Sequence, residues 1–338
     1  MKHISPELFD PRDNTIGVIS REQLEQDHGL RFQPPSEAFY DALAHPRHIK
    51  SGSLRYATYV LNQEADPDNS KPPLVVCLPF EGGAHSERSS KKLSVLASYM
   101  ARRIITIDMP ATGASESPSW LSCWRTSLDS VGETTNDILG QLKEDKEVDF
   151  MGICLGGAIA ARSAAIRENR AGKLITMTTV GFDTNLLSRT AMQKTGWGAQ
   201  AKRSLASDTH TRRVVATFDK PHRGRVDLSK LQPIFVNSRK RNLMFGKIGL
   251  SLLGRNAALR SLYRDLDPST ELHDFVGTND GFTDWEEHKT VHDRRQERHP
   301  GQSTLTLLEG AGHDWAVIHM TMAAHLAEQA LERPENIG

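Results

Sequence analysis

Short apolar runs alternate with segments of helical periodicity along most of the chain, and this alternation constrains the fold more than any other feature. The runs at 73–80 (PLVVCLPF), 103–109 (RIITIDM) and 147–153 (EVDFMGI) each precede a segment whose apolar residues recur at helical spacing. A parallel sheet with helices on both faces requires such near-continuous apolar strands, each followed by an amphipathic helix. The sequence therefore predicts an α/β fold with a mostly parallel, doubly wound sheet. The predicted strands are 54–62, 73–80, 103–109, 147–153, 173–182, 270–277 and 303–310, and the predicted helices are 90–101, 127–143, 155–169, 283–297 and 315–332.

An ordinary globular composition excludes several classes of protein. Of the 338 residues, 38% are hydrophobic and 25% are charged, which is unlike collagen or a disordered chain. No apolar window reaches the roughly eighteen residues of a membrane span, and residues 1–30 lack the apolar core of a signal peptide. Three widely spaced cysteines are too few for a disulfide framework or a zinc site. We therefore expect a cytoplasmic protein that needs no metal and no cofactor.

The alternating pattern is interrupted by a basic segment, which divides the chain into predicted regions. Between residues 183 and 264 there are seventeen lysines and arginines against four aspartates, although the whole chain is neutral. We predict an N-terminal extension at 1–50 with one helix at 36–45, an α/β core at 51–182 and 269–338, and a basic helical cap or lid at 183–268.

Two interpretations of this basic insertion remain open. It forms a cap whose charges face water, or Arg239, Lys240, Arg241 and their neighbours attract an anion. Candidate anions are the phosphates of coenzyme A, an acidic carrier protein and a negatively charged surface. No nucleic-acid-binding motif is present, so we expect no nucleic acid partner.

One glycine-rich junction carries the main chemical signal. The predicted strand 147–153 runs directly into Gly152, Cys154, Gly156 and Gly157, and then into a helix that begins at Leu155. Glycines around a nucleophile allow a strained turn and a close approach of strand and helix. The amino end of the helix also favours the thiolate form of a cysteine placed there. The pattern therefore predicts a reactive Cys154, and its alternative is a buried structural cysteine in a glycine turn.

The order of the motifs resembles the α/β-hydrolase superfamily. The resemblance covers 54–182 and 270–332, and it rests on LPFEGG, IDMPATGAS, GICLGG, GTNDGFT and GAGHDW, which occur in the family's order. Locally, GICLGGAIAARSAAI and LITMTTVGFD also resemble polyhydroxyalkanoate synthases. Dienelactone hydrolases share the G-x-C-x-G-G box, but they are smaller and lack a basic lid.

The resemblance implies a catalytic triad in the order nucleophile, acid, histidine. Cys154 is then the nucleophile and His313, which follows the last predicted strand, is the base. Asp280 matches the family's usual acid position after the strand 270–277. Asp284 and Asp183 remain as alternative acids.

The resemblance also implies an oxyanion hole built from backbone N–H groups. One donor is Leu155, which follows the nucleophile, and the other is Phe80 or Glu81. The family's commoner His-Gly pair is replaced here by Pro-Phe-Glu-Gly-Gly, so the second donor stays open between these two residues. Asp108 resembles the family's turn aspartate, and we interpret it as structural.

We therefore predict an enzyme that hydrolyses an ester or thioester through an acyl-cysteine intermediate. A cysteine at this position exchanges readily with thioesters, so acyl groups linked to coenzyme A or a carrier protein are candidate substrates. An acyltransferase with the same triad is the alternative enzyme. A non-catalytic binding protein on the same scaffold is the third possibility.

Overall fold

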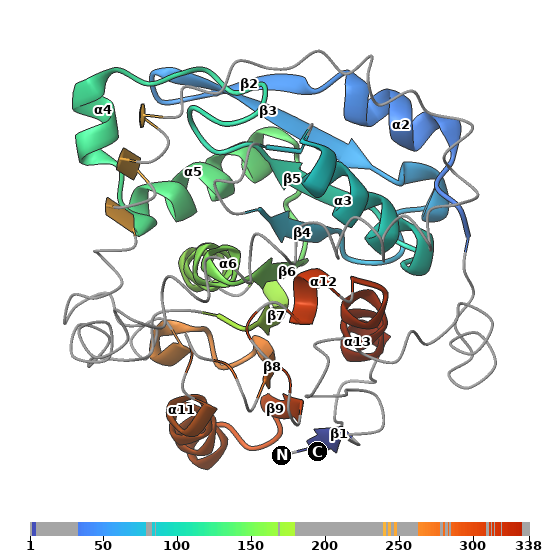
Figure 1. Ribbon diagram of the computed structural model, residues 1–338, viewed down its shortest axis with the longest axis vertical. Helices are drawn as coiled ribbons and strands as arrows, with labels where there is room; N and C mark the ends of the chain where they lie inside the picture. Colours follow the sequence, from blue (N-terminus) through green and yellow to red (C-terminus); the bar gives the residue numbers. More distant parts are fainter. Residues whose placement is uncertain are drawn as a thin grey trace.

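In the computed structural model, the described strands form one sheet that runs through the middle of the molecule (Figure 1). The structure describes residues 2–4, 33–78, 83–84, 86–167, 170–179, 239–240, 243–244, 247–248, 263–277, 280, 283, 285–308, 311, 313, 315–318 and 320–332. The strands are β1 (Lys2–Ile4), β2 (Arg47–Ser51), β3 (Leu54–Leu61), β4 (Leu74–Cys77), β5 (Ile104–Ile107), β6 (Val148–Ile153), β7 (Ala171–Met177), β8 (Glu271–Gly277) and β9 (Ser303–Leu308).

The order of the strands places β6 at the centre of the sheet. Within the described residues, nine strands follow the order β1-β9-β8-β7-β6-β4-β5-β3-β2. The pairs β2/β3 and β3/β5 are antiparallel, and every other neighbouring pair is parallel. The predicted mostly parallel α/β sheet is therefore confirmed. The segment after β6 leaves the sheet at the middle of its carboxyl edge, where open α/β sheets bind ligands.

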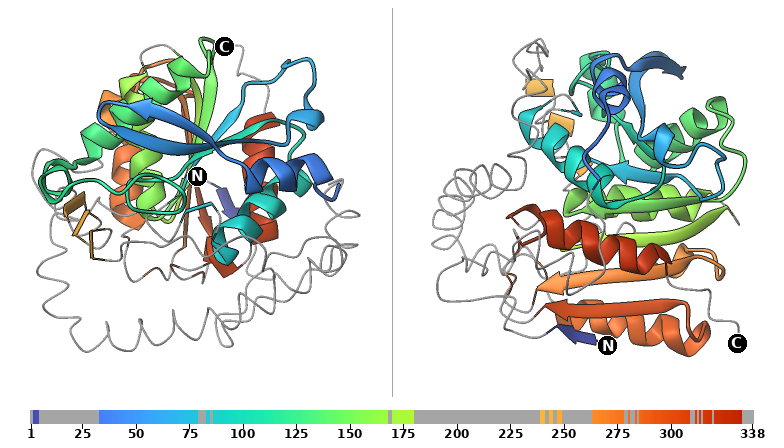
Figure 2. Two further views of the ribbon diagram at one scale, coloured as in Figure 1. Left: turned by 90° about the horizontal axis from the view of Figure 1, so that it is seen from above. Right: turned by 90° about the vertical axis from the view of Figure 1, so that its right-hand side faces the viewer.

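Helices cover both faces of the sheet, as its apolar strands require. In Figure 1, α3 and α13 lie on the right of the sheet, whereas α5, α6 and α11 lie on the left, and Figure 2 shows the same layers from two other sides. The helices are α2 (Glu37–Ala44), α3 (Glu87–Tyr99), α4 (Trp120–Arg125), α5 (Leu128–Gln141), α6 (Leu155–Ile166), α11 (Trp285–Arg298), α12 (Trp315–Ile318) and α13 (Met320–Glu332), with a short 3-10 helix at Gln63–Ala65.

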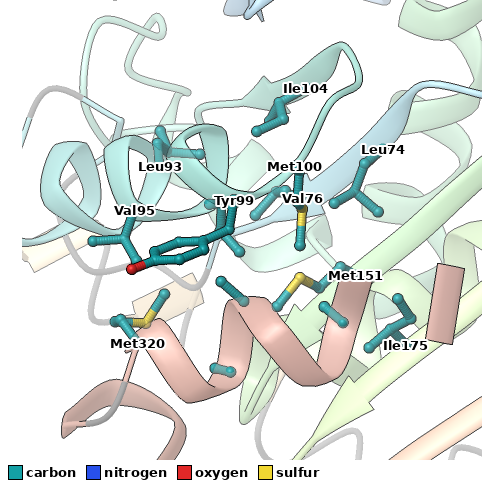
Figure 3. Packing of buried hydrophobic residues seen from close by; sticks show 14 of the residues in the cluster. Leu74, Val76, Leu93, Val95, Tyr99, Met100, Ile104, Met151, Ile175 and Met320 are labelled. Atoms are coloured by element: carbon teal, nitrogen blue, oxygen red, sulfur yellow. The ribbon is translucent and has the colours of Figure 1, made fainter. Parts of the chain in front are cut away.

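The larger hydrophobic cluster fills the space between the sheet and the pair α3 and α13. Figure 3 shows Val76 of β4, Met151 of β6 and Ile175 of β7 on the strand side of this cluster. Tyr99 of α3 and Met320 of α13 close it from the helix side, and all five side chains are buried. A second cluster on the other face joins the same strands to α5 and α6. Each central strand is therefore buried on both faces.

Several elements differ from the sequence-based expectation. Within the region expected as an N-terminal extension, β1 pairs in parallel with β9 and β2 pairs antiparallel with β3, so both add strands to the sheet. β4 ends at Cys77, three residues before the predicted end at 80, and the final predicted helix is divided into α12 and α13. The predicted strand end at 180–182 and residues 183–238 lie outside the described residues.

Among the residues that the structure describes, no helix is long and apolar enough to cross a bilayer.

Candidate functional site

Cys154 lies on a strained turn between the central strand β6 and the helix α6. Its backbone has φ 56° and ψ −122°, a combination that costs a residue with a Cβ about 1–3 kcal/mol. The backbone N–H of Cys154 donates to the carbonyl of Met177 at 2.9 Å, which ties the turn to the end of β7. The side chain of Cys154 is partly exposed. The turn therefore presents the sulfur at the carboxyl edge of the sheet.

Two glycines allow close packing around this turn: Gly152 lets β6 and α6 approach each other, and Gly157 lets α6 approach the segment after β7. A Cβ on Gly152 would lie 2.1 Å from the carbonyl oxygen of Gly156, and a Cβ on Gly157 would lie 2.0 Å from Oγ1 of Thr179. Neither distance is possible between non-bonded atoms, so a side chain at either position would displace the turn. The glycine pattern thus has the steric cause that the sequence suggested.

His313 connects the sulfur to a buried carboxylate. Nε2 of His313 lies 3.2 Å from Sγ of Cys154, and Nδ1 lies 2.9 Å and 3.1 Å from the two carboxylate oxygens of Asp280. The Asp280 side chain is fully buried and that of His313 is 12% exposed. The structure therefore brings together three residues that the sequence places 33 and 159 positions apart.

The surroundings of His313 favour its protonated form. Burial of the imidazole acts to lower its pKa, but the negative charge of Cys154 and the hydrogen bonds with Asp280 and Cys154 act more strongly in the other direction. As a result, the pKa of His313 lies well above its usual value.

The loops after β8 and β9 fix the relative position of the acid and the base. Gly277 ends β8, and a Cβ on it would lie 2.1 Å from the carbonyl oxygen of Ala311 in the loop that carries His313. The backbone N–H of Asp280 donates to Gly277 at 3.3 Å, and that of Thr283 donates to Oδ1 of Asp280 at 3.1 Å. Close packing of the two loops thus holds the carboxylate against the imidazole.

The remaining candidate residues are only partly described. Leu155 is the first residue of α6, so its backbone N–H is one of those that a helix leaves without a partner in its first turn. This N–H directly follows Cys154, which is the position expected for one oxyanion donor. Phe80 and Glu81, the two candidates for the second donor, lie outside the described residues, and so do the alternative acids Asp284 and Asp183.

Asp108 joins the loop after β4 to the loop after β5. Its buried carboxylate accepts hydrogen bonds from the backbone N–H groups of Ala84 at 2.6 Å and Ala114 at 2.8 Å, and from the hydroxyl of Tyr59 at 2.8 Å. Burial raises the pKa of Asp108 to about 6. Because all of these contacts are made inside the protein, Asp108 has the structural role that the sequence suggested.

Sequence reasoning missed a second group of titratable residues, which is buried between β8 and α11. Asp274 of β8 accepts hydrogen bonds from His288 at 2.5 Å, from His292 at 3.3 Å and from the hydroxyl of Thr176 at 2.9 Å. His292 also bonds to the hydroxyl of Ser303. The available signal was an aspartate inside a strand together with two histidines four residues apart on the following helix. All of these side chains are buried, so the group fastens α11 to the sheet.

The Cys154, His313 and Asp280 arrangement has the parts of a nucleophilic catalytic site. A thiol, an imidazole within hydrogen-bonding reach of its sulfur and a carboxylate bonded to the other nitrogen of that imidazole are the groups that such a site requires. Within the described ranges, no group of three or more histidine, cysteine, aspartate or glutamate side chains is arranged to hold a metal ion.

Comparisons with known proteins agree with this architecture. A family model described as alpha/beta hydrolase fold matches residues 72–335. A hydrolase from Pseudomonas aeruginosa PA01 superposes with a TM-score of 0.55 at 16% identity, over 86% of this chain and 99% of that chain. No curated protein matches the chain at a significant level.

Two further solved structures have similar scores. One is 2-hydroxy-6-oxo-6-phenylhexa-2,4-dienoate hydrolase from Rhodococcus sp. strain RHA1, with a TM-score of 0.52 and 18% identity over 86% of this chain and 99% of that chain. The other is an enol-lactonase from Burkholderia xenovorans LB400, with a TM-score of 0.52 and 13% identity over 85% of this chain and 100% of that chain. At these identities the likeness shows a shared fold and nothing more.

Proposed function

We propose a function for this chain from the premise that it belongs to the alpha/beta hydrolase fold family. The proposed activity is hydrolysis of an ester or thioester through an acyl-cysteine intermediate. The observation that carries the proposal is the continuous contact from Sγ of Cys154 through the imidazole of His313 to the carboxylate of Asp280. Neighbours of this fold that are described as hydrolases support the same reaction class.

The first half of the reaction transfers the acyl group to sulfur. His313 holds the proton of the Cys154 thiol, and the thiolate attacks the carbonyl carbon of the substrate. The oxyanion formed in this step is stabilised by the backbone N–H of Leu155 and by a second donor, for which Phe80 and Glu81 are the candidates. When the tetrahedral adduct collapses, His313 gives its proton to the departing alcohol or thiol. Cys154 is left as an acyl-thioester.

The second half returns the enzyme to its starting state. His313, now neutral, takes a proton from water, and the resulting hydroxide attacks the acyl-cysteine carbonyl. Collapse of this second adduct releases a carboxylic acid, and the sulfur leaves as a thiolate. Throughout both halves, Asp280 holds the imidazole by Nδ1, so that Nε2 faces the sulfur.

The nucleophile is adjacent to an apolar region that suits an acyl chain. Leu155 belongs to a hydrophobic cluster that includes Met244 and Ile248 from the basic insertion, and Cys154 packs against this cluster. An apolar acyl group bound at the sulfur would extend the same buried surface. We therefore propose that the insertion contributes to the acyl-binding side of the site.

A cysteine at the nucleophile position also supports an acyltransferase as a second candidate. A thiolate exchanges acyl groups with thioesters at little cost in free energy, so donors linked to coenzyme A or a carrier protein suit it. An alcohol or amine that excludes water from the acyl-cysteine would then receive the acyl group.

Product analysis distinguishes the candidates. The purified chain is incubated with a panel of acyl esters and acyl-thioesters, with and without alcohol and amine acceptors, and the products are separated by mass spectrometry. Release of free acid supports hydrolysis, whereas a transferred acyl product supports the acyltransferase. If neither product exceeds the background of Cys154→Ala, the chain is a non-catalytic binding protein.

A second cysteine provides the matched control. Burial raises the pKa of Cys77 to about 12, so this thiol is not a nucleophile near neutral pH. Cys77→Ala should therefore keep the activity that Cys154→Ala loses. Loss of activity in both variants alike would contradict the proposed role of Cys154.

A further inference from the structure

The helix α4 exposes large apolar side chains to solvent. Trp120 is 52% exposed, and Leu121 and Trp124 are each 59% exposed, whereas Cys123 on the inner side of the helix is fully buried. Trp120 and Trp124 are four residues apart, so they lie on the same side of the helix, with Leu121 beside them. Figure 1 shows α4 at the edge of the molecule. Clustered exposure of this kind marks an interaction site more often than a single exposed side chain does.

Two lysines of the basic insertion lie against the tryptophan rings. Nζ of Lys240 is 5.7 Å from the ring centre of Trp120, and Nζ of Lys247 is 5.7 Å from the ring centre of Trp124. Both distances are within the range of a cation–π contact. Lys240 also donates to the carbonyl of Pro118 at 2.6 Å, which fixes its position next to the helix. Each aromatic ring is therefore paired with a positive charge and still reaches solvent.

The segment that carries these lysines is anchored in the core. Met244 and Ile248 are fully buried, and they share a hydrophobic cluster with Leu155, against which Cys154 packs. Met244 and Ile248 thus face inward, while Lys240 and Lys247 contact α4. Figure 1 shows the described pieces of the segment beside α4. This anchoring keeps the lysines and the tryptophans together as one surface.

Among the described residues, α4 and the segment beside it carry Arg125, Arg239, Lys240 and Lys247 and no carboxylate. Arg125, the last residue of α4, is exposed. The carboxylates nearest in sequence are engaged elsewhere, because Glu116 accepts from the backbone N–H of Arg55 at 3.0 Å and Asp129 pairs with Arg162 at 2.8 Å. The aromatic side chains are therefore bordered by cationic side chains.

From these contacts we infer that this surface docks onto an anionic lipid surface. We call it the tryptophan–lysine surface, and it consists of Trp120, Leu121, Trp124, Lys240 and Lys247. Tryptophan rings are favoured at the boundary between lipid headgroups and acyl chains, where Leu121 would enter the apolar layer. The lysines would meet the phosphates of anionic headgroups. Docking requires no turnover, so the inference does not rest on the proposed catalytic function.

A lipid surface fits these observations better than an acidic protein does. More than half of the surface of each large apolar side chain is exposed on one short helix, so a protein partner would need a matching recess. A lipid surface deforms to accept projecting side chains and offers negative charge all around them. Docking would also bring the cluster next to Cys154 close to amphiphilic molecules, because Cys123 on the inner side of α4 belongs to that cluster.

Vesicle flotation tests the inference. The full chain is mixed with vesicles of phosphatidylcholine alone, or with vesicles that also contain phosphatidylglycerol, and the bound fraction is measured at low and high salt. We expect binding only to the anionic vesicles, and we expect added salt to weaken it. Lys240→Ala with Lys247→Ala should reduce the partition constant about thirtyfold, because each lysine near such a surface contributes about a fivefold gain.

Matched variants show whether the tryptophan–lysine surface is responsible for vesicle binding. Trp120→Ser with Trp124→Ser should reduce binding at least as strongly as the lysine pair does, whereas Lys50→Ala with Lys289→Ala removes the same charge elsewhere and should bind like the wild type. Circular dichroism confirms that each variant folds. Absence of binding to anionic vesicles, or equal binding by all variants, overturns the inference. So does binding of a polyglutamate peptide to this surface in the absence of any vesicle binding.

Discussion

Replacing Asp280 by asparagine is expected to lower kcat/KM by about 10²- to 10⁴-fold. Both carboxylate oxygens of Asp280 face Nδ1 of His313, at 2.9 Å and 3.1 Å, and the side chain is fully buried. Removing one partner of a buried charge pair costs about 3–5 kcal/mol. This cost falls on the imidazolium form of His313, which must protonate the leaving group. Because each ~1.4 kcal/mol of transition-state stabilisation changes the rate tenfold, the loss spans about two to four powers of ten.

The assay measures initial rates of acyl-thioester hydrolysis from about pH 5 to pH 9, with the fold of each variant checked by circular dichroism. Asp293→Asn is the matched control, because Asp293 is exposed on α11 and pairs with Lys289. A loss smaller than tenfold in Asp280→Asn would refute the reasoning. A larger loss in Asp284→Asn than in Asp280→Asn would also refute it, since Asp284 would then be the orienting acid.

Three further predictions test the electrostatics and packing of the site and of the fold. Cys154→Ala should lower the pKa of His313 toward its usual value, because it removes the leading cause of the increase; histidine NMR titration checks this, and an unchanged pKa would contradict it. Asp274→Asn should lower the free energy of unfolding at neutral pH by about 3 kcal/mol in urea titrations. Its pairing with the two neighbouring histidines outweighs burial and holds the pKa of Asp274 well below its usual range, so its contribution is present above about pH 4 and is lost below it. The difference in free energy of unfolding between Asp274→Asn and the wild type should therefore shrink on acidification. A difference that stays constant with pH would contradict the pairing of Asp274 with the histidines. Gly152→Ala should destabilise the fold by about 1–3 kcal/mol. Gly140→Ala is the control, because its Cβ would meet nothing within 4 Å, and it should be neutral or stabilising. Equal effects of the two substitutions would contradict the steric role of Gly152.

The central part of the fold could be predicted because its physical signals are local. The strand β6 is nearly continuously apolar and is buried over its first five residues, as a strand between two helical layers must be. The glycines beside Cys154 predicted a close approach of strand and helix. In the structure, a Cβ on Gly152 would collide with the carbonyl oxygen of Gly156. The positions of Asp280 and His313 followed from the order of strands and loops in a resembling family.

Other elements carry too little local signal for prediction. The helix α4 spans six residues, which is too short for a helical periodicity to appear. The edge strand β2 has only one buried residue, so its sequence shows no apolar alternation. Hydrogen bonding to β3, which is encoded in another part of the chain, makes it a strand.

The buried polar group around Asp274 could not be predicted for a different reason. Its histidines meet the aspartate only after α11 packs against β8, so no pattern within one element reveals the contact. The same holds for the tryptophan–lysine surface, where the aromatic residues and the lysines come from segments more than 110 residues apart. Contacts between segments that are far apart in the chain can be identified only once the folded structure is known.

Intact-mass spectrometry during turnover tests most directly whether Cys154 is the nucleophile. The chain is mixed with an acyl-thioester and quenched in acid at short times, and the modified residue is located by peptide mapping. We predict an added mass equal to one acyl group on Cys154 in the wild type, none in Cys154→Ala, and a persistent adduct when deacylation is slowed in Asp280→Asn. Turnover without any adduct on Cys154, or turnover by Cys154→Ala at the wild-type rate, would contradict this role.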